Sequence, residues 1–283
     1  MTTYNRPDAL HAVLKAFERQ ERIVPEEWEL LIADDGSSEA TQLLIEQFSG
    51  RSRLQIEHVW HQDEGFRAAE IRNKAADRAK SDYLVFIDGD CIPMPDFLAK
   101  HLELAEPGKS VAGNRILLSE NYTEKLLASD NPIAPLGWGV ASWCMAKLSG
   151  KVNKSVGWLR LDLKDWRDRK ASDWRIYRSC NIGLWKADLL AVDGFDASFS
   201  GWGYEDSDLA VRLLRHGIKF KDGRFAIPVL HLWHHENDRS SQAENWNRFE
   251  KSLRGTHVKA INGMSALIRE EKISMSLELN WPK

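Results

Sequence analysis

Two short apolar runs, each ending abruptly in acidic residues, constrain this chain more than any other feature of its sequence. The first run is Trp28–Ala33, followed by Asp34-Asp35-Gly36-Ser37, and the second is Tyr83–Ile87, followed by Asp88-Gly89-Asp90. A short apolar run closed by a polar, glycine-containing turn is typical of a buried strand. We therefore predict two core strands that each deliver carboxylates to the position where the strand ends.

Helical patterns alternate with these strands in the first half of the chain. Pro7 suits a first helical position, and apolar residues then recur at helical spacing to about residue 20. Further helices are predicted from near Ser38 and over Ala68–Ala79, with another strand at Leu54–Val59. This alternation predicts an α/β fold with a mainly parallel central sheet flanked by helices, in which ligands gather at the carboxyl ends of the strands.

The second half of the chain is less regular. Periodicity fades over residues 118–178, a tryptophan-rich, charged stretch that we interpret as a loop, lid or insertion. A helix at about Glu205–His216 and a strand near Ala226–Leu230 follow, and residues 241–271 show the pattern of two amphipathic helices. We divide the chain into residues 1–118, 119–178 and 179–238 and a helical tail, 239–283.

Composition argues against several classes of function. The 283 residues include 39 basic and 42 acidic side chains, so a net charge of −3 offers no excess to neutralise a nucleic-acid backbone. No apolar run has the length of a membrane span, and the first twenty residues lack a signal-peptide core. Three scattered cysteines predict neither a disulfide framework nor a zinc cluster. We expect no nucleic-acid partner, and a cytoplasmic location or a peripheral one at the inner face of the membrane.

Asp88-Gly89-Asp90 is a candidate metal site. Two carboxylates two residues apart point to the same side of an extended backbone, and their hard oxygen atoms suit Mn²⁺ or Mg²⁺. The glycine between them lets a phosphate-bearing ligand approach the backbone. The alternative interpretation is a solvated turn. His231, His234 and His235 cluster after the last predicted strand and are either further ligands of the same ion or ordinary surface and core histidines.

Three other segments are candidates for binding or catalysis. One carboxylate of Asp34-Asp35-Gly36-Ser37 could accept a hydrogen bond from a nucleobase, or the segment could serve only as a turn and helix cap. Arg67 and Arg72 could contact a nucleotide or be solvated. Gly201–Asp206 places a tryptophan and two acids at the start of a helix, which suits either a sugar site with a proton-accepting carboxylate or simple capping.

Together and in this order, these segments resemble the family 2 glycosyltransferases of the GT-A fold. The resemblance lies in Thr2–Pro7, Asp34–Ser37, Gly65–Asn73 and Asp88–Asp90. The stretch Asn181–Asp206 is similar to the carboxyl-terminal module of β-galactosyltransferases and of bacterial chondroitin-type polymerases. The resemblance covers about residues 1–118 and 178–238. It implies a nucleotide-sugar-binding half, an acceptor and catalytic half and, at 119–178, an insertion or an acceptor or lid region between them.

The resemblance also implies roles for individual residues. The donor nucleotide is assigned to Thr2, Tyr4, Arg6, Asp35, Arg67 and Asp88. The divalent ion is assigned to Asp90 and His234, and the acceptor sugar to Trp202 and Glu205. Asp206 matches the catalytic base, and His231 is a second candidate ligand of the ion.

One departure from the resembled family concerns the start of the sequence. Members of that family carry a hydrophobic strand ahead of the Thr-Tyr-Asn segment, whereas Met1 alone precedes Thr2 here. Either the start of the sequence is misassigned or this strand is missing, and a missing central strand would leave sheet hydrogen bonds unpaired and weaken the pocket for the uridine.

The function implied by the resemblance is inverting, metal-dependent transfer of a sugar. The donor is a UDP-hexose or UDP-N-acetylhexosamine, and the acceptor is a hydroxyl of a glycan or lipid-linked glycan in polysaccharide or lipopolysaccharide synthesis. A nucleotidyltransferase, which also uses paired carboxylates and a divalent ion, and a non-catalytic carbohydrate-binding protein are the alternatives. The tryptophans of residues 119–178 either cover the acceptor, rest on a membrane or pack as an insertion.

Overall fold

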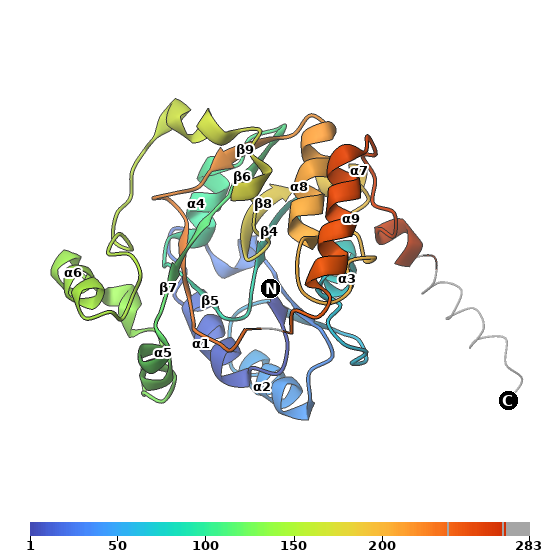
Figure 1. Ribbon diagram of the computed structural model, residues 1–283. Coiled ribbons are helices and arrows are strands. Elements are labelled where there is room, and N and C mark those ends of the chain that lie inside the picture. Colours follow the sequence, from blue (N-terminus) through green and yellow to red (C-terminus); the bar gives the residue numbers. More distant parts are fainter. Residues whose placement is uncertain (237, 268, 270–283) are drawn as a thin grey trace, which may run out of the picture.

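The computed structural model describes residues 1–236, 238–267 and 269, and Figure 1 shows strands in the centre with helices around them. One sheet has the order β1 (Thr2–Thr3), β2 (Leu30–Asp34), β3 (Ile56–Trp60). A second has the order β4 (Tyr83–Ile87), β8 (Asn181–Trp185), β6 (Lys109–Ala112), β9 (Lys219–Asp222). A third has the order β5 (Cys91–Pro93), β10 (Pro228–His231), β7 (Asn114–Leu117).

Helices cover both faces of the first sheet. The helices are α1 (Pro7–Phe17), α2 (Glu39–Ser49), α3 (Ala68–Arg78), α4 (Phe97–Leu104), α5 (Glu120–Leu127), α6 (Val140–Leu148), α7 (Lys186–Ala191), α8 (Glu205–Arg215) and α9 (Gln242–Arg254). Successive residues of β2 point to opposite faces. Leu30 and Ile32 therefore join the core that contains α1 and α2, whereas Leu31 and Ala33 join the core that contains α3 and α8. This two-sided burial explains why the first four residues of β2, Leu30–Ala33, are all apolar.

The predicted α/β fold class is confirmed. The sheet of β1, β2 and β3 is wholly parallel, as the alternation of strands and helices indicates. β6 pairs in parallel with β9, and β7 with β10. β8 is different, because it runs antiparallel to both β4 and β6. The antiparallel insertion of β8 brings residue 181, at its start, to the end of the sheet where β4 finishes.

The first strand is short rather than absent. Thr2 and Thr3 pair in parallel with Ala33 and Asp34 of β2, and Thr2 also forms a bridge to Asp88 just after β4. The sheet hydrogen bonds that were expected to be unpaired are therefore formed at the end of the sheet that carries the acidic residues. Farther back, β2 and β4 flank an apolar cavity of about 200 Å³ whose lining includes Leu31, Leu84 and Phe86.

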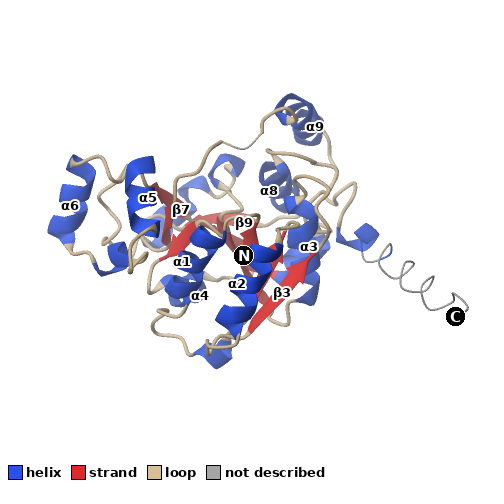
Figure 2. Cartoon of the chain, turned by 90° about the horizontal axis from the view of Figure 1, so that it is seen from below, coloured by secondary structure: helices blue, strands red, loops and turns tan. Residues whose placement is uncertain are grey.

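The stretch at residues 118–178, predicted as a loop, lid or insertion, is partly helical. It contains α5 and α6 as well as 3-10 helices at Lys164–Lys170 and Trp174–Ile176. Figures 1 and 2 both show α5 and α6 at one side of the molecule, with α6 at the outer end. We call residues 119–157 the α5–α6 lobe.

The helical tail is confirmed in part. α9 is the first of the two predicted helices, whereas the second falls partly on residues 268 and 270–283, outside the described residues. Within the part of the chain that the structure describes, no helix combines the length and apolarity needed to cross a bilayer.

A buried ion pair fixes α8 to its surroundings. Arg212, fully buried, donates from Nε to Asp208 Oδ2 at 2.7 Å and from Nη1 to the carbonyl oxygens of Val192 and Gly194. Ser252 of α9 donates to the other Asp208 oxygen at 2.6 Å. Removing one member of such a pair leaves a buried charge without compensation.

We expect Arg212→Ala to lower the free energy of unfolding by about 3–5 kcal/mol, because Asp208 then stays buried without its cation. Urea titration followed by circular dichroism measures the change. Arg248→Ala is the matched control, since Arg248 forms an exposed i,i+4 pair with Glu244 on α9, and its loss should cost only about 0.3–0.5 kcal/mol. Equal effects of the two substitutions would contradict this account of α8.

Candidate active site

The acidic residues after β4 lie against the first strand. The Gly89 amide donates to the Thr2 carbonyl oxygen at 2.7 Å, so the Asp88–Asp90 turn is tied to β1. A Cβ atom at position 89 would lie 3.0 Å from that same oxygen and 3.1 Å from the Thr3 side chain. Glycine therefore eases the close approach of the two backbones, where a Cβ atom would fit only tightly.

Asp90, His231 and His234 converge on one point. His234 Nε2 lies 3.4 Å from Asp90 Oδ2, and His231 Nε2 lies 3.8 Å from the same oxygen. One potential ligand atom of each residue falls within 4.8 Å of the others. The sequence predicted Asp90 and His234 as ligands and named His231 as a second candidate, and the fold brings all three together.

The donor set and its orientation fit a divalent cation. His234 Nδ1 lies 2.6 Å from the carbonyl oxygen of His235, so the proton is expected on Nδ1 and the lone pair on Nε2, the atom that faces Asp90. Burial lowers the pKa of His231, although the charge of Asp90 opposes the shift. A neutral imidazole is the form that binds a metal. One carboxylate and two neutral imidazoles suit Mn²⁺ better than Mg²⁺, which prefers oxygen ligands alone.

The first acidic turn contains two buried carboxylates, Asp34 and Asp35, the latter only 3% exposed. Asp34, fully buried, accepts hydrogen bonds from the Ser37 amide at 2.8 Å and lies 2.9 Å from His58 Nε2. Asp35 is held by His61 Nε2 at 2.7 Å and by the Arg67 amide at 2.8 Å. Asp34 thus stabilises the turn itself. Nucleotide binding stays a prediction for Asp35 alone.

Three other residues assigned to the nucleotide lie around this turn. The Tyr4 hydroxyl donates to Asp63 Oδ2 at 2.9 Å, and the Tyr4 side chain is exposed. Arg6 donates to the carbonyl oxygen of Trp233, which precedes His234. The Arg67 guanidinium pairs with Glu70 at 3.2 Å. Their contact with a nucleotide remains a prediction.

Arg72 joins the two acidic clusters. Its Nη2 donates to Asp88 at 3.2 Å, its Nη1 to Glu205 at 3.1 Å and its Nε to the Thr2 hydroxyl at 3.0 Å, while the side chain is only 5% exposed. Burial raises the pKa of Asp88 and of Glu205, and the charge of Arg72 opposes both shifts. The guanidinium therefore compensates negative charge on the two carboxyl groups that lie against it.

Sequence reasoning offered nucleotide contact or solvation for Arg72, and the structure shows it buried against protein carboxylates. A signal was available: Arg72 lies on the same face of α3 as Ala68, Ala69, Ala75 and Ala76, which are all buried. An arginine within an alanine stripe at i±3 and i±4 spacing is expected to point into the interior.

Glu205 and Asp206 begin α8 but have different surroundings. Glu205 is committed to Arg72. Asp206, half-buried, accepts a long hydrogen bond of 3.4 Å from the Ser179 amide and one of 3.2 Å from the Ser207 hydroxyl. Trp202, three residues before the first residue of α8, is half-buried, and the Arg239 guanidinium lies 4.9 Å from its ring centroid. Both acids lie in the first turn of α8, at the positive end of the helix dipole.

The turn before α8 is strained. Tyr204 adopts φ = 71°, a left-handed conformation that is uncommon for a residue with a side chain. Its ring stacks on Phe249 of α9 at 5.5 Å between centroids and lies 5.2 Å from Trp246. This aromatic packing holds the turn, and the turn aims the first residues of α8.

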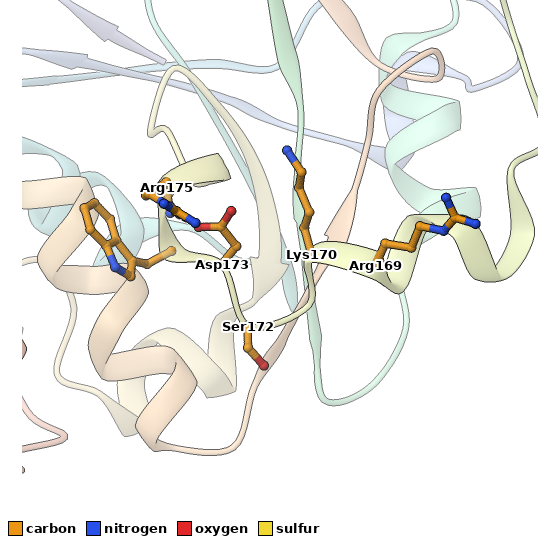
Figure 3. Close-up of a pocket in the computed structure, with 6 residues that line it drawn as sticks. Arg169, Lys170, Ser172, Asp173 and Arg175 are labelled. Atoms are coloured by element: carbon orange, nitrogen blue, oxygen red, sulfur yellow. Dashed lines mark hydrogen bonds and ion pairs between the residues drawn. The ribbon is translucent and has the colours of Figure 1, made fainter.

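A pocket of about 380 Å³ lies on the segment after the α5–α6 lobe (Figure 3). It is lined by Arg169, Lys170, Ser172, Asp173, Trp174 and Arg175. Asp173 and Arg175 form an ion pair of 2.7 Å, whereas Arg169 and Lys170 extend in different directions. The pocket includes none of the predicted site residues, so it is separate from the candidate active site.

Comparison with known proteins places the chain in a family. The family described as "Glycosyl transferase family 2" matches residues 1–149, and the "N-terminal domain of galactosyltransferase" matches residues 167–236. Validoxylamine A glucosyltransferase of Streptomyces hygroscopicus subsp. limoneus is 30% identical over 259 residues, covering 87% of this chain and 54% of that protein. The chain therefore belongs to glycosyltransferase family 2.

Other relatives and solved structures are consistent with this family and with the predicted fold. Chondroitin synthase of Escherichia coli is 28% identical over 77% of this chain, which spans 32% of that enzyme. TarS 1-349 of S. aureus has a TM-score of 0.59 at 12% identity, covering 94% of this chain and 66% of that one. The mannosyltransferase PcManGT of Pyrobaculum calidifontis has a TM-score of 0.58 at 16% identity, covering 97% and 68%. These structures confirm the predicted GT-A fold.

We expect the ion pair of His61 and Glu70 to contribute stability that depends on pH. The His61 imidazolium, whose Nδ1 lies 3.6 Å from Glu70 Oε1, lowers the pKa of Glu70 from 4.5 to about 2. Because the folded pKa is the lower one, this stability is present above pH 4.5 and is lost as the pH falls towards 2. Glu70→Gln should therefore reduce the free energy of unfolding by about 2 kcal/mol near pH ~6.

Denaturant titrations at several pH values test this expectation. The difference between wild type and Glu70→Gln should shrink as the pH falls through the interval from 4.5 to about 2. Glu64→Gln is the control, because the Glu64 side chain is 63% exposed although it also pairs with Arg67. A difference that stays constant across the interval would contradict the assigned ion pair.

Proposed function

We propose that the protein transfers a hexose or N-acetylhexosamine from a UDP-sugar to a hydroxyl of a glycan acceptor, with inversion, in polysaccharide or lipopolysaccharide synthesis. The observation that carries the proposal is the convergence of Asp88 and Asp90 with Glu205 and Asp206 around Arg72 and β1. Family membership supports it, and TarS 1-349 has been solved in complex with UDP and with UDP-GlcNAc. Contact with a bilayer would bring a lipid-linked acceptor within reach.

Asp206 acts as the general base in this proposal. Its carboxylate takes the proton of the acceptor hydroxyl while that oxygen forms a bond to the anomeric carbon. The bond from this carbon to the diphosphate oxygen breaks at the same time, and UDP leaves with the electron pair. Glu205, held by Arg72, and Trp202 are proposed to position the acceptor, while Asp35, Thr2, Tyr4, Arg6 and Arg67 hold the nucleotide and Asp88 its ribose.

A divalent cation, proposed as Mn²⁺ or Mg²⁺, would be held by Asp90 and His234, with His231 as a further ligand. When bound, it supplies Lewis-acid neutralisation of the negative charge that develops on the departing diphosphate. The protein's own contribution is to orient the ligand atoms, through the contact of His234 Nδ1 with the His235 carbonyl oxygen and the fixed Asp88–Asp90 turn.

We expect Asp206→Asn to lower kcat by about 10²–10⁴-fold, because the amide cannot accept the hydroxyl proton. Release of UDP or of pyrophosphate from a panel of UDP-sugars, with and without acceptor glycans, measures the rate and identifies the donor. The anomeric configuration of the product, read by NMR, tests inversion. Calorimetry should show nearly unchanged donor affinity for this variant.

Glu205→Gln is the comparison for Asp206→Asn, since it removes a neighbouring charge but keeps an oxygen for Arg72. Its loss of kcat should be much smaller. Release of pyrophosphate would favour a nucleotidyltransferase. Glycan binding with no turnover of any donor would favour a carbohydrate-binding protein and overturn the proposal.

Metal binding is tested separately from turnover. Calorimetric titration with Mn²⁺ should show one site in the wild type, and Asp90→Asn and His234→Ala should each weaken it at least about tenfold, because a ligand is lost. His235→Ala is the matched control, since the His235 backbone carbonyl, not its exposed ring, contacts His234. Unchanged Mn²⁺ affinity in both ligand variants would refute this site.

A further inference from the structure

We propose that the outer face of α6 docks the protein on an anionic lipid bilayer. The proposal goes beyond the transfer reaction and depends on neither the donor nor the metal. It rests on three features, which are an exposed apolar face of α6, the basic residues and lack of acids in residues 131–161, and a connection from the α5–α6 lobe to the histidine loop of the candidate active site.

The first feature is the distribution of side chains around α6. Trp143 and Ala146 are buried, and Trp143 packs its ring 5.2 Å from that of Trp138 and against Gly157, where a Cβ would come within 2.2 Å of it. With 100° between successive residues, the opposite side spans an arc of about 140°. That arc is formed by Val140, Ala141, Cys144, Met145 and Leu148.

Every residue of this arc is apolar and exposed. Val140 is 49% exposed, Met145 63% and Leu148 81%, and Ala141 and Cys144 are exposed too. Figures 1 and 2 agree in placing α6 at the outer end of the lobe, away from the sheets. A helix that buries one side and presents a second, continuous apolar side to solvent is suited to a further apolar environment.

The second feature, the charge around α6, indicates what its apolar face binds. Residues 131–161 contain Lys147, Lys151, Lys154 and Arg160 and no acidic residue, in a chain whose net charge is −3. Arg160 is paired with Asp96, whereas the three lysines are exposed. Lys147 lies on α6, beside the apolar arc. An apolar helix face bordered by lysines is complementary to the headgroups and acyl boundary of an anionic bilayer.

The third feature connects the lobe to the site. The Trp233 amide, one residue before His234, donates to the Thr123 hydroxyl of α5 at 2.9 Å. The return segment of the lobe is held to the end of β7, since Leu118 bridges Val152 and the Asn153 amide donates to the Leu117 carbonyl oxygen at 3.0 Å. Docking through α6 would therefore hold the candidate active site at the membrane surface, where a lipid-linked acceptor lies.

Sedimentation with lipid vesicles tests the proposal. We expect the full-length protein to bind vesicles that mix phosphatidylglycerol with phosphatidylcholine, to bind pure phosphatidylcholine far less, and to dissociate as salt is added. The double variant Met145→Glu/Leu148→Glu should bind the mixed vesicles at least about tenfold more weakly, because two large apolar side chains are replaced by anions. Ile261→Glu is the matched control, since Ile261 is 81% exposed like Leu148.

Cys144 offers a second measurement without a new residue. It is exposed, whereas Cys91 and Cys180 are buried, so a polarity-sensitive fluorophore should label Cys144 selectively. Its emission should shift to the blue on addition of mixed vesicles. Thermal melting confirms that the double variant is folded. Its release of UDP with a water-soluble acceptor should equal that of the wild type, which separates failure of docking from failure of catalysis.

The contrary outcomes are equally clear. Absence of vesicle binding by the wild type, or equal binding by the double variant, would overturn the proposal. Self-association that depends on Met145 and Leu148, without binding to vesicles, would assign the face to a second copy of the chain and would overturn it as well.

Discussion

One buried guanidinium holds the candidate active site together. Arg72 reaches from α3 to Asp88 after β4, to Glu205 at the start of α8 and to Thr2 in β1. Two carboxylates from segments more than a hundred residues apart would repel each other in a buried environment, and a cation between them converts the repulsion into attraction. The relative position of the end of β4 and the start of α8 therefore depends on this residue, for which the sequence context offered only nucleotide contact or solvation.

Backbone contacts hold the turns of the candidate active site in place. Gly89 lets the Asp88–Asp90 turn lie against β1, and Asp34 holds the first acidic turn by accepting a hydrogen bond from the Ser37 amide. The Gly201 amide donates to the Phe66 carbonyl oxygen at 3.0 Å, which ties the turn before α8 to the loop that carries Arg67. The contacts of Gly89 and Gly201 join segments that are distant in sequence, so the site is rigid only when the whole fold has formed.

α5 and α9 support the candidate active site from outside it. α9 stacks Phe249 and Trp246 on Tyr204, whose left-handed backbone would otherwise be unfavourable. α5 accepts the hydrogen bond that anchors the loop of His231 and His234. The α5–α6 lobe and the tail thus support the candidate active site, although neither supplies a predicted catalytic group.

Local sequence was sufficient to predict the main helices and strands and most of the candidate site residues, because these depend on short-range patterns. The apolar runs before Asp34 and Asp88, the helix at Ala68–Arg78 and the acids at the start of α8 could all be read in this way. The short sequence of β1, the antiparallel direction of β8, the helices of the α5–α6 lobe and the burial of Arg72 could not. These features are fixed by pairing and charge compensation between residues far apart in the chain, so only the tertiary structure decided them.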